Sequence, residues 1–416
     1  MRRSQVVVLV TLLVAYASLY LCRANLEAAM PLLIADGVAD KTSLGQLSST
    51  ATFAYAIGKI VMGTIGDVIG GKRLMLVAVG GSVVCSVAFG LQHAFVALVV
   101  FAAANRFFQS GGWAGLVHVV SRRFEAARHG GVMGILSTSY DLGNIAALAL
   151  SGFVARWGWR TLFVVNPALL ALVGGGAVLS LRAAPPLPDE VAAARTTPAG
   201  TKPWQDEARV PLGVILRQLF SRGTFFTALA LSALITFIRI AFLTWTPTFL
   251  YEVSGKGAGQ ASASIFKSIA FPAAGVVASL TVGFLSDKLG PGRRAPIMAV
   301  SLTVVVALVL VLGHGVATSP FAVVPLLFAI GLFVLGPYSL PAGAVALDVA
   351  GKRGAATAAG LIDGAGYLGA TASGYVLGKL ADRSGWSAAF DVIAAVALVA
   401  ALVSAAWAVV VARRRA

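Results

Sequence analysis

Two arginines lie inside long apolar segments, at matching places in the first and second parts of the chain. Arg23 lies in VVVLVTLLVAYASLYLCRANLEAAMPLLI, and Arg239 lies in FFTALALSALITFIRIAFLTWTPTFL. Placing an arginine at the centre of a lipid bilayer costs about 2.5–3.5 kcal/mol on insertion scales, so such a residue normally faces a water-filled cavity or the interior of a helical bundle. Two arginines in matching segments therefore predict a cavity that holds a small anion.

Three tyrosines and a lysine accompany the first arginine at helical spacing. Tyr16, Tyr20 and Arg23 are separated by four and three positions, which places them on one face of a helix. Tyr55 and Lys59 are four positions apart in the next apolar segment. A tyrosine considered alone is more often a packing or interfacial residue, so the grouping with Arg23 and Lys59 is what gives these tyrosines functional interest.

The apolar segments that carry these residues recur along the whole chain. Of the 416 residues, 58% are hydrophobic and 12% are charged, and the mean hydropathy is +0.88. A helix of about 20 apolar residues spans the bilayer core. Segments of this kind cover residues 5–33, 44–66, 74–92, 95–121, 131–155, 160–182, 222–251, 262–286, 295–313, 319–346, 355–381 and 387–412. The sequence thus predicts an all-α membrane protein with twelve transmembrane helices in two six-helix bundles.

The connections between these segments predict the domain organisation and the orientation. Residues 183–221 are rich in proline and charge, so we expect a six-helix bundle over 1–182, a cytoplasmic linker over 183–221 and a second bundle over 222–416. The net charge is +16, and most Lys and Arg fall on the side of the N-terminus. This asymmetry predicts a protein of the inner membrane with both termini in the cytoplasm. The positive net charge then reflects the orientation in the membrane, and nucleic-acid binding is not needed to explain it.

Matching residues in the two parts of the chain are separated by nearly constant offsets of about 220 positions. Three pairs follow this offset: Arg23 with Arg239, Asp67 with Asp287, and Asp141 with Asp363. A repeat of six spans is typical of transporters that rock two halves around a site near the membrane midplane.

Two loops carry a recognisable motif. GTIGDVIGGKR contains Asp67, and GFLSDKLGPGRR contains Asp287. Both resemble the signature loop of the major facilitator superfamily. The stretch from Arg106 to Gly111 resembles a looser second motif of that superfamily. Asp67 and Asp287 are therefore expected to act in gating, by accepting hydrogen bonds from basic residues or from a helix N-terminus on the inner face.

The whole set of motifs, from about residue 5 to 412, resembles the organophosphate:phosphate antiporter family. The resemblance rests on YxxxYxxR, YAIGK and RxxxxxWxP, which follow one another in order. It implies that Arg23 and Arg239 grip a phosphate or carboxylate from opposite halves with planar guanidinium groups. It also implies that Lys59 adds a point charge and that hydroxyl donors line the pocket. These donors are Tyr16, Tyr20 and Tyr55.

The chain departs from the family pattern at charged positions inside the spans. Lys267 stands where the glycerol-phosphate member of the family has a glutamate, so a buried charge network has been replaced. Candidates for coupling or gating are Asp141, Asp363, Lys267, His118 and Arg106. We hypothesise an ion pair between Lys59 and Asp363, because both lie about 12 Å from the inner ends of spans that face each other in this fold. The alternative is that Asp363 pairs within its own half, with Lys267.

These observations predict a secondary transporter rather than an enzyme. The sequence shows no clustered metal ligands, no nucleophile–base pair and no phosphate-binding loop, so no metal and no cofactor are expected. We expect a monomer in the lipid bilayer that exchanges a small organic phosphate for inorganic phosphate by alternating access, with no nucleic-acid partner. The alternatives are a carboxylate, sulfonate or phosphonate transporter, a proton-coupled exporter that uses Asp141 and Asp363, and a membrane sensor of sugar phosphates.

Overall fold

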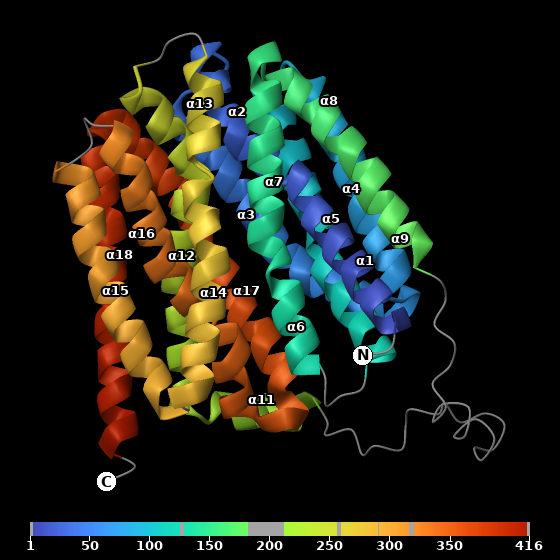
Figure 1. The fold of residues 1–416 in the computed structure, drawn as a ribbon, viewed down its shortest axis with the longest axis vertical. Helices are drawn as coiled ribbons and strands as arrows, with labels where there is room; N and C mark the ends of the chain where they lie inside the picture. Colours follow the sequence, from blue (N-terminus) through green and yellow to red (C-terminus); the bar gives the residue numbers. More distant parts are fainter. Residues whose placement is uncertain are drawn as a thin grey trace.

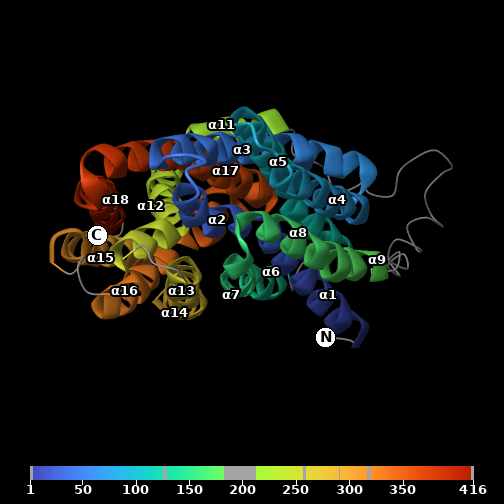
Figure 2. The same cartoon turned by 90° about the horizontal axis from the view of Figure 1, so that it is seen from above.

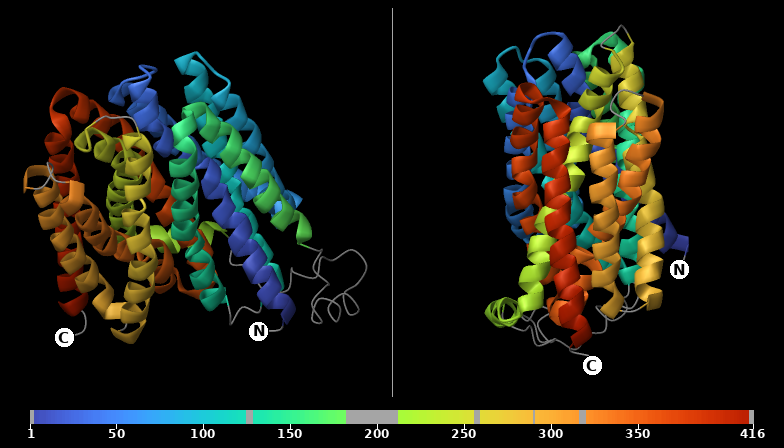
Figure 3. Two further views of the ribbon diagram at one scale, coloured as in Figure 1. Left: turned by 45° about the horizontal axis from the view of Figure 1, so that its top comes forward. Right: turned by 90° about the vertical axis from the view of Figure 1, so that its left-hand side faces the viewer.

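The protein is an elongated bundle of helices that run between two ends (Figure 1). This computed structural model describes residues 3–124, 129–181, 212–255, 259–289, 291–315 and 320–413. Throughout these ranges the regular structure is helical, so the predicted fold class is confirmed. Both described ends of the chain lie at the same end of the bundle, as two further views show (Figure 3). We call this the terminal end and the opposite one the distal end.

The first half of the bundle contains the first six predicted segments. Its helices are α1 (Arg3–Leu19), α2 (Ala24–Ala35), α3 (Lys41–Ile69), α4 (Gly71–Gly90), α5 (Phe95–Arg123), α6 (His129–Ser137), α7 (Ser139–Val154), α8 (Trp159–Leu169) and α9 (Gly176–Ser180). Three segments are broken. A 3₁₀ turn at Tyr20–Cys22 separates α1 from α2, α6 meets α7 at Thr138, and a π-helical turn at Leu170–Gly175 separates α8 from α9.

The second half contains the last six predicted segments. Its helices are α11 (Leu212–Phe220), α12 (Gly223–Val253), α13 (Gln260–Lys267), α14 (Ala270–Leu289), α15 (Arg294–Leu310), α16 (Pro320–Tyr338), α17 (Ala346–Arg383) and α18 (Gly385–Arg413). Helix α11 lies inside the stretch that we expected to be a linker. It forms because Leu219 packs with Phe225 and Ala228 of α12 in a small buried cluster. Residues 183–211 of the expected linker lie outside the described part.

The twelve predicted segments differ in apolarity. By length and hydropathy, nine helices of the described residues could cross a membrane. The other three segments are α3, α6 with α7, and α17, and these carry Lys59, Asp141 and Asp363. In the fold, α3 packs along α17, and α7 packs along α13 and α14 (Figure 2).

The two halves are joined at the distal end. Lys41 Nζ at the start of α3 lies 3.0 Å from Glu252 Oε1 of α12 and 3.8 Å from Asp382 Oδ1 of α17. The backbones of α3 and α17 also touch, since a Cβ atom added to Gly45 would lie 2.4 Å from the carbonyl oxygen of Gly374. The structure therefore holds the distal end closed.

Candidate functional site

A break in the first span positions Arg23. The 3₁₀ turn at Tyr20–Cys22 frees backbone carbonyls that a regular helix would use, and side chains of α5 bind them. The carbonyl oxygen of Cys22 accepts hydrogen bonds from Asn105 Nδ2 at 3.0 Å and from Gln109 Nε2 at 2.9 Å. The carbonyl of Arg23 accepts one from Arg106 Nη2 at 3.1 Å. Because these donors fix the break, the Arg23 side chain leaves the helix in a defined direction.

Aromatic rings surround the Arg23 guanidinium. Its Cζ atom lies 4.3 Å from the centre of the Tyr55 ring and 5.3 Å from that of Tyr20. Its Nη2 donates a hydrogen bond of 3.3 Å to the hydroxyl of Tyr367, which belongs to α17 in the other half. Ring faces attract a cation while leaving the N–H edge free, so Arg23 keeps its capacity to bind an anion.

Lys59 and Asp363 form the ion pair that the sequence led us to hypothesise. The pair joins α3 to α17 and so links the two halves near the arginine. The Lys59 ammonium also lies 4.8 Å from the centre of the Tyr367 ring. The alternative partner, Lys267, sits half-buried at the end of α13 and forms no ion pair with any described residue.

Arg239 lies in the middle of α12 and is only 3% exposed. Its Cζ lies 4.5 Å from the centre of the Tyr338 ring. Its Nη1 is buried and has no hydrogen-bond partner among the described residues. A buried N–H group of a charged side chain without a partner is costly, so this atom indicates a position where a ligand can bind.

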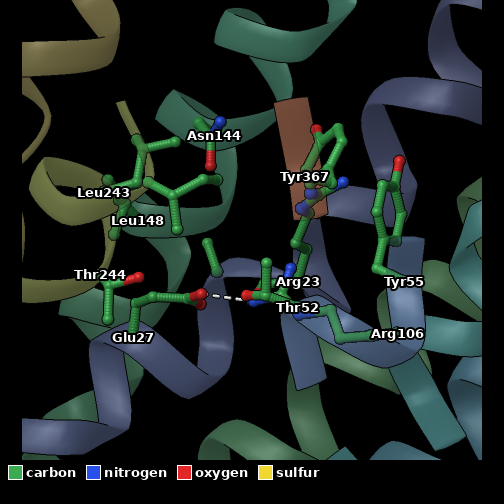
Figure 4. Close-up of a pocket in the computed structure, with 12 residues that line it drawn as sticks. Arg23, Glu27, Thr52, Tyr55, Arg106, Asn144, Leu148, Leu243, Thr244 and Tyr367 are labelled. Atoms are coloured by element: carbon green, nitrogen blue, oxygen red, sulfur yellow. Dashed lines mark hydrogen bonds and ion pairs between the residues drawn. The ribbon is translucent and has the colours of Figure 1, made fainter. Parts of the chain in front are cut away.

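A cavity of about 520 Å³, open solvent included, lies next to Arg23 between the halves (Figure 4). Its polar and charged lining consists of Arg23, Glu27, Thr52, Tyr55, Arg106, Asn144, Thr244 and Tyr367. Its apolar lining consists of Ala24, Leu148, Ile240 and Leu243.

Arg106 and Glu27 form a second buried ion pair at the wall of this cavity. Arg106 comes from α5 and Glu27 from α2, four positions beyond Arg23. Their side chains are 10% and 11% exposed. The pair neutralises itself, and it therefore adds no net charge to the cavity.

The remaining predicted site residues lie in other surroundings. Tyr16 is buried against Trp113 and Tyr140, with ring centres 5.2 and 5.7 Å away, in an aromatic cluster of the first half. His118 is half-buried, and its Cβ lies where a side chain on Gly71 at the start of α4 would reach. It is twelve positions from Arg106 on α5, about 18 Å along the helix, so it lies away from the cavity.

Asp141 is buried at the contact between the halves. It is 7% exposed, and its carboxylate packs against Gly275 of α14, where an added Cβ would lie 2.7 Å away. Glycine at 275 is what leaves room for this carboxylate. The expected gating residues Asp67 and Asp287 sit on helices α3 and α14, but their side chains lie outside the described residues.

Sequence reasoning named only Arg23, Tyr55 and Arg106 among the cavity residues, and two of those it missed, Tyr367 and Glu27, carry a readable signal. Tyr367 follows Asp363 by four positions on α17, and Lys59 follows Tyr55 by four positions on α3. Because these two helices run in opposite directions, the tyrosine and the charged residue appear in reversed order. Glu27 follows Arg23 by four positions, so it had to share a helical face with that arginine. A carboxylate inside an apolar span is as informative as an arginine.

The charges around the cavity favour an anion. Glu27 and Asp363 are each paired with a cation, whereas Arg23 and Arg239 form no ion pair with any described carboxylate. The Arg23 guanidinium in the cavity lining therefore remains available for ligand oxygens, and so does the buried guanidinium of Arg239, which does not belong to that lining. Among the described residues, no group of three His, Cys, Asp or Glu side chains could hold a metal ion.

Comparisons with known proteins show the family of the chain. The chain matches the Major Facilitator Superfamily over residues 12–374 and 270–416. It is 30% identical to a probable hexose phosphate transport protein of Chlamydia pneumoniae, covering 94% of this chain and 88% of that one. It is 25% identical to the glycerol-3-phosphate transporter of Bacillus subtilis, covering 94% and 89%, and 26% identical to the membrane sensor protein UhpC of Escherichia coli, covering 95% and 90%.

Solved structures share the fold at low sequence identity. A bacterial homolog of the human lysosomal transporter Spinster, inward-facing and unoccupied, superposes with a TM-score of 0.74 at 16% identity, over 99% of this chain and 98% of the other. A D-xylose–proton symporter gives a TM-score of 0.74 at 14% identity over 96% of each chain. The chain therefore belongs to the Major Facilitator Superfamily of membrane transporters and, within it, to the organophosphate:phosphate antiporter family.

Proposed function

We propose that this protein transports a small organic phosphate in exchange for inorganic phosphate, with Arg23 and Arg239 binding the phosphate group from opposite halves. One observation carries the proposal: Arg23 is half-buried in the cavity wall and Arg239 is 3% exposed, and neither has a carboxylate partner among the described residues. The names of the relatives, which include hexose phosphate and glycerol-3-phosphate transporters, support the same ligand class.

Charge balance favours exchange over one-way release. Bringing the two halves together around two unpaired cations is costly, because a buried charge without a partner is strongly destabilising. A bound phosphate oxyanion supplies the missing negative charge and lowers that cost. The halves should then interconvert readily when either side of the site is occupied, and slowly when it is empty.

The halves also need a way to open the end that is closed here. Opening the distal end breaks the contacts of Lys41 with Glu252 and Asp382, and it separates α3 from α17. We place this distal end outside the cell and both termini in the cytoplasm, in line with the distribution of basic residues. We further propose that the protein works as a monomer in the inner membrane.

Counterflow in proteoliposomes tests the proposal. Vesicles loaded with radiolabelled phosphate should release the label when phosphate or an organic phosphate is added outside, and only slowly into ligand-free buffer. Empty vesicles and the exposed variant Asp391→Asn serve as controls, since Asp391 is 50% exposed and pairs with His314 away from the cavity. Rapid release into ligand-free buffer under a pH gradient alone would contradict exchange and favour proton coupling. Equal release by dicarboxylates would contradict the phosphate assignment.

A sensor function is a second candidate, because the membrane sensor protein UhpC of Escherichia coli is 26% identical over 95% of this chain. A sensor would bind organic phosphates yet exchange them slowly. Measuring binding by calorimetry beside the counterflow rates separates the two functions. Tight binding with negligible counterflow in wild-type vesicles would favour the sensor.

A further inference from the structure

We propose that Glu27, held by Arg106, accepts a hydrogen bond from a hydroxyl group of the transported phosphate ester, so that the cavity selects hydroxylated esters over plain alkyl phosphates. This inference rests on the proposed function, because it assumes that Arg23 and Arg239 bind the phosphate end. It adds the residue that recognises the other end of the ligand.

The position of Glu27 suits this task. Glu27 and Arg23 are four positions apart on one face, which corresponds to about 6 Å along the helix. Both side chains line the same cavity (Figure 4). A phosphate at Arg23 would therefore place the carbon skeleton of an ester beside Glu27.

The two oxygens of Glu27 are in different situations. Oε1 binds Arg106 Nη2, whereas Oε2 is buried and accepts no hydrogen bond from any described residue. Among the described residues, the buried side-chain atoms without a partner include only two from charged groups: Glu27 Oε2 and Arg239 Nη1. One is an acceptor and the other is a donor. Glu27 lines the cavity, so a hydroxyl group of a ligand held there would satisfy its Oε2, whereas Arg239 is not part of that lining.

Arg106 explains how a carboxylate can lie in a site for anions. An isolated glutamate next to the cavity would repel a phosphate ester, but the ion pair with Arg106 neutralises it. Arg106 is fixed in turn by its hydrogen bond to the carbonyl oxygen of Arg23. Glu27 can thus act as a hydrogen-bond acceptor without adding net negative charge.

The rest of the cavity wall fits a hydroxylated carbon chain. Leu148 and Leu243 supply apolar contacts, while Thr52, Asn144 and Thr244 supply hydroxyl and amide groups. Small-molecule sites commonly combine an apolar wall with a few polar groups that fix the orientation of the ligand. A wall for a bare inorganic ion would need no such apolar surface.

Matched ligand pairs test the inference. We would measure dissociation constants by calorimetry for glycerol phosphate against propyl phosphate and for sorbitol 6-phosphate against hexyl phosphate. Wild-type protein should prefer the hydroxylated member by about tenfold or more, since a hydrogen bond to a charged acceptor is worth at least one factor of ten. In Glu27→Gln the preference should fall to about threefold or less. Asp391→Asn should keep the wild-type ratio.

A second variant keeps the test decisive if Glu27→Gln fails to fold because Arg106 loses its partner. Glu27→Gln combined with Arg106→Gln removes the ion pair as a neutral unit and should show the same loss of preference. If a folded variant keeps the wild-type ratio of the two dissociation constants, the inference is wrong. The inference is also wrong if the variant loses the same factor of affinity for the hydroxylated and the alkyl phosphate. Equal wild-type affinities would refute the hydroxyl subsite alone. Failure of wild-type protein to bind any phosphate ester would refute the proposed function.

Discussion

Exchanging the charges of Lys59 and Asp363 tests the contact between the halves. The two side chains are 17% and 24% exposed and form an ion pair beside the Tyr367 ring. Removing one partner of a fully buried pair costs about 3–5 kcal/mol, because the other charge stays buried alone. The partial exposure here lets water screen the remaining charge, so we expect about 2–3 kcal/mol for each single variant.

The double variant should recover much of that loss. Lys59→Asp and Asp363→Lys each place two like charges side by side, whereas the combination restores opposite charges in reversed order. We expect a coupling free energy of about 2 kcal/mol, within the range found for residues in direct contact. In a domain as large as one half of this protein, 1 kcal/mol of stability corresponds to about 2–4 °C of melting temperature. The double variant should therefore melt about 4–8 °C higher in detergent than the sum of the two single changes predicts.

The pair of His314 and Asp391 provides a matched control on the surface. Its side chains are 54% and 50% exposed, so Asp391→Asn should change stability by less than about 1 kcal/mol. Thermal unfolding is the appropriate readout, because Lys59 also lies near the proposed ligand and exchange rates would mix two effects. A double variant no more stable than the two single changes predict would show that the Lys59–Asp363 contact does not stabilise this state.

Three further predictions concern other parts of the molecule. Arg23→Lys and Arg239→Lys should each lower phosphate counterflow about a hundredfold at unchanged melting temperature, because lysine keeps the charge but loses the planar pair of donors. Tyr367→Phe removes the hydroxyl that accepts from Arg23 but keeps the ring, so ligand affinity should change by less than about tenfold, measured by calorimetry. Hydrogen bonds from Ser43 hold the pKa of the Asp40 carboxyl below its usual value, so this N-cap stabilises α3 above about pH 4 and less under more acidic conditions. Asp40→Ala should therefore cost about 1 kcal/mol at neutral pH and less at pH 3, measured by thermal unfolding.

The fold and one ion pair between the halves could be predicted from the sequence. Apolar segments of membrane length locate the helices, and the repeated offset pairs Arg23 with Arg239. The contact of Lys59 with Asp363 was predicted because the two residues lie at similar distances from the inner ends of their helices. The rise per residue of a helix converts sequence position into this distance. These inferences succeed because they depend on spacing along one helix or on symmetry between the halves.

Features that depend on packing between helices could not be predicted in this way. The break at Tyr20–Cys22 exists because Asn105 and Gln109 of a distant helix bind the freed carbonyl of Cys22. Nothing local in the first span requires that break. The pocket for Asp141 likewise depends on Gly275, which belongs to the other half. Helix α11 was missed because the proline-rich stretch before it suggested a linker throughout.

The glycine contact at the distal end has a consequence for the speed of transport. Where α3 meets α17, a Cβ on Gly374 would lie 2.6 Å from the carbonyl oxygen of Gly45, and one on Gly378 would lie 2.4 Å from that of Lys41. A seam of bare backbone has no side-chain rotamers to order when it forms, so closing it sacrifices little conformational entropy. Rigid helices can thus separate and rejoin there as smooth surfaces. Side chains still become ordered elsewhere along this contact, where the Tyr55 ring meets that of Tyr367 and the Ser49 hydroxyl accepts a hydrogen bond from the backbone of Tyr375.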